Sequence, residues 1–439
     1  MLSIGALCCV LSAAGFAQDL PTPSQQPLDI GPSLMVGDES ALPETNAAEP
    51  AAMDAAESPD AVLDAPNPGP PASKWKFLPH FDLGIRWDDN IFIQPTNETS
   101  DLIFTFSPGI AIGYLDEETR LLRFLERESR ASRIDRFDGQ FLLLDYTPSF
   151  VVFSDNGSED SFDQEARFEA RWQFQKLSLA AQARYISAQE ANVELNQRLE
   201  HTGESAGISA NYQLTERTSL EVGGYFQNDE YENASGNTEY RGEAFIGYEL
   251  TPVVKFGLGV AFGVIEVENA SNQTFERVLA RGSYALTEKV EAAVLAGVEF
   301  RHSDDGGEDR TNPVFEINLS YLPAEATRVT LNVSRQVLSS ISSPSEFVTA
   351  TGFSLRFARM LRDGVRLTAE GGYRNSEYSD SGLGEPRTDD YFYGQVALQY
   401  NFATWGSASL SYEYRQSDSS RSESDFTNNQ IAFGFSVTF

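Results

Sequence analysis

A turn sequence that returns every 36 residues is the feature that most restricts the fold of this chain. The stretches YQLTER, YELTPV and YALTEK share a tyrosine, with a leucine two residues later. The repeated positions are Tyr212, Tyr248 and Tyr284, followed by Leu214, Leu250, Leu286 and Leu322. A fixed period of this length indicates that one supersecondary unit is repeated along the chain.

The residues between these turns alternate in polarity, which is typical of β-strands. In 288–301, Val290, Val294 and Val298 fall on one face, whereas Glu291 and Glu299 fall on the other. Successive strand residues point to opposite faces of a sheet, so each such segment is apolar on one side only. Two of these segments, one tight turn and one longer polar loop make up the period. The repeat is therefore predicted to be a β-hairpin.

Eighteen segments of this kind are predicted between residues 77 and 439. They are 77–87, 101–115, 138–152, 162–174, 176–188, 201–214, 217–228, 237–250, 254–266, 273–286, 288–301, 311–322, 326–336, 348–361, 364–377, 388–402, 405–417 and 425–439.

Long alternating strands with turns and loops in strict succession predict an all-β fold, a transmembrane antiparallel up-and-down β-barrel. A propeller blade buries both faces of its sheets, and a sandwich has irregular spacing and Greek-key connections. The predicted strands are instead long enough to cross a bilayer at a tilt. In such barrels the short turns lie in the periplasm and the long loops lie outside. The tyrosines before the turns would then meet outer-membrane lipid at its boundary with water.

The composition excludes some functions and divides the chain into parts. With 65 acidic and 32 basic residues the formal charge is −33, which argues against nucleic acid as a partner. Residues 1–17, MLSIGALCCVLSAAGFA, resemble a secretory signal cleaved after Ala17. No Lys or Arg precedes the apolar run, which leaves the true start codon open. Both cysteines of the chain, Cys8 and Cys9, lie in this segment, so the mature protein is predicted to contain no thiol.

Residues 18–73 are predicted to form a disordered tether in the periplasm. They contain 11 of the 20 prolines, ten acidic residues and no Lys, Arg or His. A segment without aromatic residues cannot bury enough apolar surface to offset the entropy lost on ordering. The barrel domain is therefore predicted to occupy residues 74–439.

The chain ends in QIAFGFSVTF, in which every second side chain is apolar. This ending resembles the assembly signal of bacterial outer-membrane proteins, a last strand that terminates in phenylalanine. The resemblance implies recognition by the barrel-assembly machinery. The residues that carry it are Ile431, Phe433, Phe435, Val437 and Phe439.

A second resemblance covers most of residues 77–439. The stretches IRWDDNIFIQPTNETSDLIFTFSPGIAIGY and LLLDYTPSFVVFSDNGSEDSFDQEARFEARWQF are similar to the "putative β-barrel porin" family of Gram-negative bacteria. The shared residues are Asp89, Asn90, Ile91 and Phe92, then Ser100 and Asp101, then Ser107, Pro108 and Gly109, and finally Tyr146 to Ser149. The resemblance implies an integral protein of the bacterial outer membrane, and some members accompany the export of exopolysaccharide.

Residues 116–137 depart from the family pattern, because a short periplasmic turn is expected there. This insertion carries six arginines at near-helical spacing. It is either a small periplasmic helix that touches a partner or a solvated extension of the hairpin.

The sequence gives no support for catalysis. The three histidines, His80, His201 and His302, are far apart, and no phosphate-binding loop opens a helix. We therefore expect no enzyme activity, no catalytic residue, no metal and no cofactor.

Charged residues instead fall on the polar phase of the strands and are predicted to line a water-filled lumen. The candidates are Arg167, Arg171, Arg241, Glu243, Arg281, Glu299, Arg301, Arg356, Arg366, Glu370, Arg374, Glu413 and Arg415. They could select the solute that passes, or they could form ion-pair ladders that brace neighbouring strands, and both can hold together.

The predicted function is a porin-like channel for small hydrophilic solutes. Two alternatives remain open from the sequence. One is an export channel for a secreted polysaccharide, and the other is a structural or adhesive barrel whose lumen is plugged by loops or by the tether. The patterning does not identify the solute or the oligomeric state.

Overall fold

The computed structural model describes residues 75–114, 140–287, 289–304, 309–324, 326–342, 347–378 and 387–439. The predicted signal (1–17), tether (18–73) and insertion (116–137) lie outside these residues, and their roles stay predictions. No helix in the described ranges is long and apolar enough to cross a membrane.

Eighteen β-strands account for nearly all of this part of the chain. The first nine are β1 (Trp75–Asp88), β2 (Asp101–Tyr114), β3 (Phe141–Phe153), β4 (Ser161–Gln173), β5 (Leu177–Asn192), β6 (Gln197–Gln213), β7 (Thr218–Tyr231), β8 (Asn237–Thr251) and β9 (Val254–Val267). The others are β10 (Gln273–Thr287), β11 (Val290–Ser303), β12 (Arg310–Ala324), β13 (Thr327–Ser339), β14 (Phe347–Arg362), β15 (Val365–Tyr378), β16 (Thr388–Ala403), β17 (Gly406–Ser419) and β18 (Phe426–Thr438).

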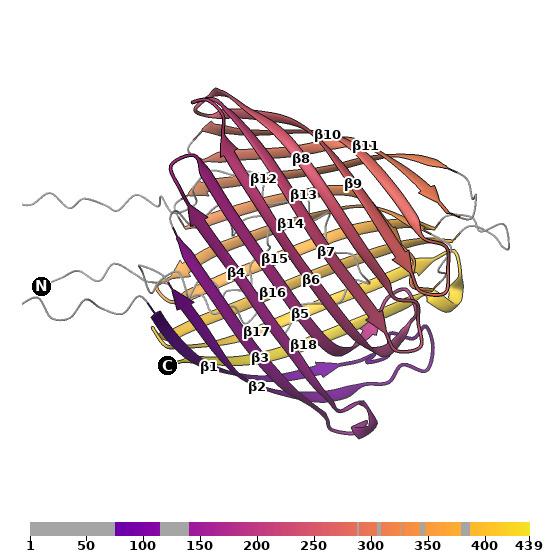
Figure 1. The fold of residues 1–439 in the computed structure, drawn as a ribbon. Coiled ribbons are helices and arrows are strands. Elements are labelled where there is room, and N and C mark those ends of the chain that lie inside the picture. The colour runs from indigo at the N-terminus through magenta and orange to yellow at the C-terminus, as the bar shows by residue number, and fades with distance from the viewer. Residues whose placement is uncertain are drawn as a thin grey trace, which may run out of the picture.

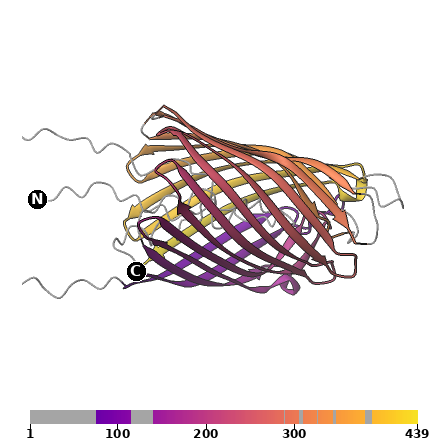
Figure 2. The ribbon, with the colours of Figure 1, turned by 45° about the horizontal axis from the view of Figure 1, so that its top comes forward.

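Every strand pairs antiparallel with its neighbours in the chain, and the sheet closes on itself. β1 pairs with β2 along one edge and with β18 along the other. Figures 1 and 2 show the tilted strands of the near and far walls crossing one another, as in a cylinder. Closure leaves no unpaired sheet edge, which a structure surrounded by hydrocarbon requires. The predicted fold, an 18-stranded up-and-down barrel, is confirmed.

The outer face of the barrel is apolar. On β9, Phe256, Leu258 and Phe262 point outward and are 46–59% exposed, whereas the inward phase of the same strand holds Gly259 and Gly263. Fully burying such a side chain is worth about 1.5–3 kcal/mol relative to leaving it in water. So many exposed apolar side chains are stable only against lipid.

The repeated tyrosines and leucines lie on this outer face next to the short turns. The tyrosines are Tyr212, Tyr248 and Tyr284, and the leucines are Leu214, Leu250 and Leu286, all of them exposed. Their rings and branched chains occupy the level at which amphipathic aromatic residues meet the membrane boundary.

The two ends of the barrel have different connections. At one end, here called the turn end, residues 252–253, 363–364 and 404–405 each join two strands directly. Gly364 has a φ of 73°, which a tight turn demands and which other residues rarely adopt. The C-terminus and the start of β1 lie at the turn end (Figure 1). The opposite end, here called the loop end, carries the longer connections.

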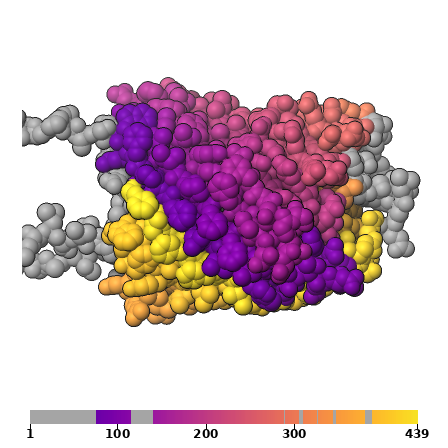
Figure 3. Space-filling model, turned by 90° about the horizontal axis from the view of Figure 1, so that it is seen from below, coloured from indigo at the N-terminus to yellow at the C-terminus, as the bar shows by residue number. Residues whose placement is uncertain are grey.

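The seam between β1 and β18 is the join that closes the barrel. Its ladder contains nine residue pairs, against fourteen between β1 and β2. In Figure 3 the indigo first strands lie directly beside the yellow last strands. Side chains extend the seam at the loop end: Asn429 donates through its backbone N and its Nδ2 to the carboxylate of Asp89, at 2.6 and 2.7 Å. Gln430 Nε2 donates to Asp88 at 2.8 Å. The Asp-Asn motif of the family resemblance thus joins the first strand to the last.

Candidate functional site: the barrel lumen and its mouth

All thirteen predicted lumen residues lie on the inward phase of their strands. On β7, for example, Leu220 and Val222 are exposed on the outer face, whereas Glu221 between them is buried. Directly paired residues of neighbouring strands point to the same face of the sheet. The strand pairings therefore place all thirteen predicted residues on the inner face. What these charges do depends on their partners, and the structure divides them into groups.

The first group is interlocked and buried on β10 and β11. Glu299 is inaccessible to solvent and accepts from Arg277 Nε at 2.7 Å and from Arg301 Nε at 2.8 Å. Both guanidinium groups also stack on the ring of Phe275, at 4.3 and 5.6 Å from its centroid. Arg277 was absent from the predicted set. Its neighbours on the same face, Phe275 and Leu279, are apolar, so the alternation of polarity that identifies an inner face is weak on this strand.

Glycines on β9 make room for the rings beneath these arginines. A Cβ on Gly259 would overlap the Phe245 ring, and one on Gly263 would overlap the Phe275 ring. Arg281 stacks on Phe245 at 4.3 Å and donates to Glu221 Oε2 at 3.0 Å. The inner wall of β8–β11 is therefore packed almost like a protein core.

A second interlocked group lies on β1, β3 and β4. Asp145 is buried between His80 Nε2 at 3.0 Å and Arg167 Nη2 at 2.8 Å. His80 reaches Asp145 across β2 because Gly109 has no side chain there, and a Cβ at that position would overlap the imidazole. These contacts connect three strands on the inner surface, which supports the ladder interpretation for Arg167.

A third group, on β14 and β15, is open to solvent. Arg356 Nε and Glu370 Oε2 are 3.9 Å apart, and their side chains are 40% and 29% exposed. Arg366 lies opposite Met360 on β14 and Gln399 on β16, neither of which carries a charge. Solvent screens a pair such as Arg356 and Glu370, so it stabilises the wall little and leaves its charges accessible.

The mouth at the loop end is crossed by the tip of the β5–β6 hairpin, residues 193–196. Asn192 shapes this turn by accepting from the backbone N of Glu194 and Leu195, at 3.0 and 3.2 Å. Asn196 adopts a φ of 51°, a conformation that asparagine tolerates. Val193 packs with Ile93 of the β1–β2 loop and, beyond the seam, with Tyr391 of β16 and Phe426 of β18.

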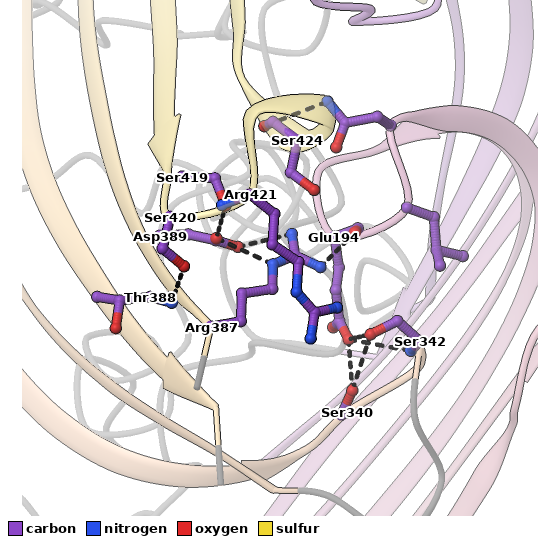
Figure 4. A network of polar contacts seen from close by, with 12 residues as sticks. Glu194, Ser340, Ser342, Arg387, Thr388, Asp389, Ser419, Ser420, Arg421 and Ser424 are labelled. Atoms are coloured by element: carbon purple, nitrogen blue, oxygen red, sulfur yellow. Dashed lines mark hydrogen bonds and ion pairs between the residues drawn. The ribbon is translucent and has the colours of Figure 1, made fainter. Parts of the chain in front are cut away.

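Glu194 anchors the tip to the opposite wall, as Figure 4 shows. Its Oε1 accepts from Ser340 Oγ at 2.5 Å, from Ser342 Oγ at 2.6 Å and from Ser342 N at 3.0 Å. Ser340 follows β13, which is eight positions from β5 (13 − 5) in a ring of 18, so the tip reaches across most of the mouth to make these bonds.

Arg387 completes this mouth network, which comprises Glu194, Ser340, Ser342, Arg387 and Asp389. Arg387 Nη1 donates to the backbone O of Glu194 at 3.1 Å, while its Nε and Nη2 hold Asp389 at 2.9 and 2.7 Å. Burial lowers the pKa of Arg387, but the neighbouring Tyr378 and Asp389 outweigh burial and raise this pKa overall. The guanidinium therefore keeps the charge with which it holds Asp389.

The predicted assembly signal lies on the outward phase of β18, as its alternation requires. Ile431 and Phe433 are exposed on the lipid face, and Phe435 stacks on Phe402 with ring centroids 5.7 Å apart. Val437 pairs with Phe81 of β1, and Phe439 N donates to Pro79 O at 2.8 Å. Recognition of these residues by assembly machinery stays a prediction.

A closed antiparallel barrel with an apolar exterior and a charged interior defines an outer-membrane β-barrel of the porin type. The family model described as "Putative beta-barrel porin 2" matches residues 67–439, and the chain belongs to this family. Membership implies a channel that carries out no covalent chemistry.

Solved structures similar to this chain include proteins of two bacteria. The chain is similar to OccK11 (OpdR) of Pseudomonas aeruginosa, with a TM-score of 0.43, 11% identity, and coverage of 83% of this chain and 96% of that one. It is also similar to OccAB4 of Acinetobacter baumannii, with a TM-score of 0.43, 10% identity and coverage of 83% and 98%. No curated protein sequence matches the chain.

Proposed function

We propose that the protein passes hydrophilic solutes across the outer membrane through the lumen of its barrel. The observation that carries this proposal is the inner wall of β13–β15, where Arg356, Arg366 and Glu370 remain accessible to solvent. A barrel that served only as a scaffold would gain little from solvent-screened charges that stabilise their neighbours so weakly. An 18-stranded barrel is also wide enough to contain water.

The β5–β6 tip sets the narrowest part of the path in this proposal. It occupies the mouth and is bound to both walls through Glu194 and Asn196. The short turns would face the periplasm and the mouth network the exterior, following the usual orientation of such barrels.

Single-channel recording in planar bilayers tests the proposal. The full chain, purified in detergent, is expected to give steady openings, and Glu194→Ala is expected to give larger ones because it releases the tip from Ser340 and Ser342. Glu232→Ala is the matched control, since it removes an exposed carboxylate from the next loop. Absence of openings in all three proteins would exclude passive passage.

The mouth network supports one alternative, the plugged barrel. Its contacts join opposite walls and bury Glu194 and Ser340. A silent wild type together with a conducting Glu194→Ala variant would establish that the resting barrel is closed.

Export of a secreted polysaccharide is the alternative implied by the family resemblance. It would use the same lumen and so predicts the same conductance. Deleting the gene in its host separates the two: loss of secreted polysaccharide with unchanged uptake of small solutes would favour export.

A further inference from the structure

The inner wall of β13–β15 carries an excess of positive charge. On the inward phase of these three fully described strands, four residues are arginine and one is glutamate. The arginines are Arg328, Arg356, Arg366 and Arg374, and the acid is Glu370. In a chain with a formal charge of −33, this local reversal of sign requires an explanation.

The wall on the other side of the lumen has the opposite sign. The strands nine positions from β13–β15 in the ring are β4–β6 (13 − 9 = 4, 15 − 9 = 6), and β7 and β8 lie beside them. The inward phase of β4–β6 carries four acidic and three basic side chains, and that of β7 and β8 adds five acidic side chains and one basic one. The acids are Asp163, Glu165, Glu169, Glu190, Glu221, Asp229, Glu239, Glu243 and Glu249, and the bases are Arg167, Arg171, Arg184 and Arg241. The two walls therefore produce a field across the lumen.

The arginines of β15 are spaced along the barrel axis. Arg366 lies next to the turn end, and Arg374 lies eight residues further toward the mouth on the same face. At about 3.3 Å per residue the two are separated by roughly 26 Å along the strand. Arg356 lies opposite Glu370, midway between them. The positive charges thus accompany a solute through most of the lumen.

These guanidinium groups retain donors that can bind a solute. Arg366 has no carboxylate opposite it on β14 or β16. Arg374 stacks on Tyr391 at 5.0 Å, and its Nε has no hydrogen-bond partner among the described residues. Arg328 and Arg366 flank β14 at nearly the same level, because they pair with Ala358 and Met360, so a bound anion could lie beside both guanidinium groups.

We infer that the β13–β15 wall selects small hydrophilic anions that bear carboxylate or phosphate groups. The planar guanidinium fork binds both kinds of oxyanion through paired hydrogen bonds. The acidic wall repels the same anion and so directs it toward the arginines. This inference rests on the proposed passage through the lumen.

The reversal potential in a KCl gradient tests the inference. Arg356→Gln combined with Arg366→Gln is expected to lower the chloride-to-potassium permeability ratio about threefold to fivefold, because each change removes one charge beside the path. Arg359→Gln is the matched control: it removes the same charge from β14 but on its exposed outer phase, opposite Leu367. Arg366→Lys should keep the wild-type ratio.

Binding provides a second readout that does not depend on conduction. Citrate and inorganic phosphate, each radiolabelled, are dialysed against the detergent-solubilised full chain. We expect the double variant to lose affinity for one or both probes, which identifies the oxyanion preferred, whereas Arg359→Gln retains it. Heat-modifiable migration on gels confirms that each variant is a folded barrel.

The outcomes distinguish this inference from the proposed function. A conducting channel whose selectivity is the same in the double variant and in Arg359→Gln would overturn anion selection and leave passage intact. A silent wild type would overturn passage, and loss of oxyanion binding in the double variant alone would still support recognition. Equal binding by all variants would overturn it.

Discussion

The inner walls of β10–β11 and of β14–β15 both carry arginine and glutamate. These side chains are buried in ion pairs on the first wall and are accessible to solvent on the second. Glu299 on β11 is completely buried between Arg277 and Arg301. Arg356 and Glu370 on β14 and β15 are 40% and 29% exposed and 3.9 Å apart. One wall uses charge to hold strands together, and the other leaves its charge available to whatever enters the lumen.

The difference between the two walls originates in the strand beside each of them, which is β9 for β10–β11 and β13 for β14–β15. β9 presents glycines to the lumen, so Phe245 and Phe275 lie flat against the wall and the arginines of β10 stack on them. β13 instead presents small polar residues such as Thr330 and Asn332, which form no such platform. Whether an inward-facing charge stabilises the wall or stays available to a solute therefore depends on the side chains that the neighbouring strand presents to the lumen.

Removing the central carboxylate of the packed wall should have the largest effect. Glu299→Ala leaves Arg277 and Arg301 buried without a counter-charge, which typically costs about 3–5 kcal/mol. Urea unfolding in detergent measures this cost. Glu276→Ala, an exposed acid on the outer phase of β10, should stay within about 0.5 kcal/mol of wild type. If the two variants were equally stable, the buried ion pairs of β10–β11 would not stabilise the barrel, and the proposed difference between the two walls would be wrong.

Filling the glycine platform should have a smaller effect. Gly259→Ala forces its new methyl group into the Phe245 ring, and overpacking of this kind costs about 1–3 kcal/mol. Gly394→Ala on β16 is the control, because a Cβ there would meet no atom within 4 Å. If Gly259→Ala unfolds at the same urea concentration as Gly394→Ala, the platform has no role in stability.

Truncation on the open wall should change stability least. Arg356→Ala removes a solvent-screened partner of Glu370, and such pairs contribute about 0–1 kcal/mol. The same urea titration is expected to give a midpoint close to that of wild type. A loss as large as that of Glu299→Ala would show that the open wall is also structural.

Most of the strands could be predicted from the sequence because lipid on one side and water on the other impose strict alternation. The predicted segment 254–266 corresponds to Val254–Val267, and 273–286 corresponds to Gln273–Thr287. The largest difference is at the β5–β6 hairpin, predicted as 176–188 and 201–214 but observed as Leu177–Asn192 and Gln197–Gln213.

The extra length of β5 and β6 could not be inferred locally. Residues around Glu194 are polar and read as an ordinary loop, and their burial depends on Ser340, Ser342 and Arg387, which are 146 to 193 positions away. The seam contacts of Asp88 and Asp89 with β18 join residues still further apart, 339 to 342 positions. The predicted lumen set lies on the inward phase, but alternation alone does not reveal which charges are paired, and the role of the set in selectivity stays a prediction.

Cysteine labelling along β15 tests the central claim most directly, namely that one phase of the wall meets water and the other meets lipid. In a background with Cys8 and Cys9 replaced by serine, single cysteines are placed from residue 366 to residue 371 and treated in liposomes with a membrane-impermeant maleimide. We predict labelling at 366, 368 and 370, protection at 367, 369 and 371, and protection of Leu295→Cys on the packed wall. Labelling that does not alternate along β15, or protection of both phases, would contradict an open, charge-lined lumen.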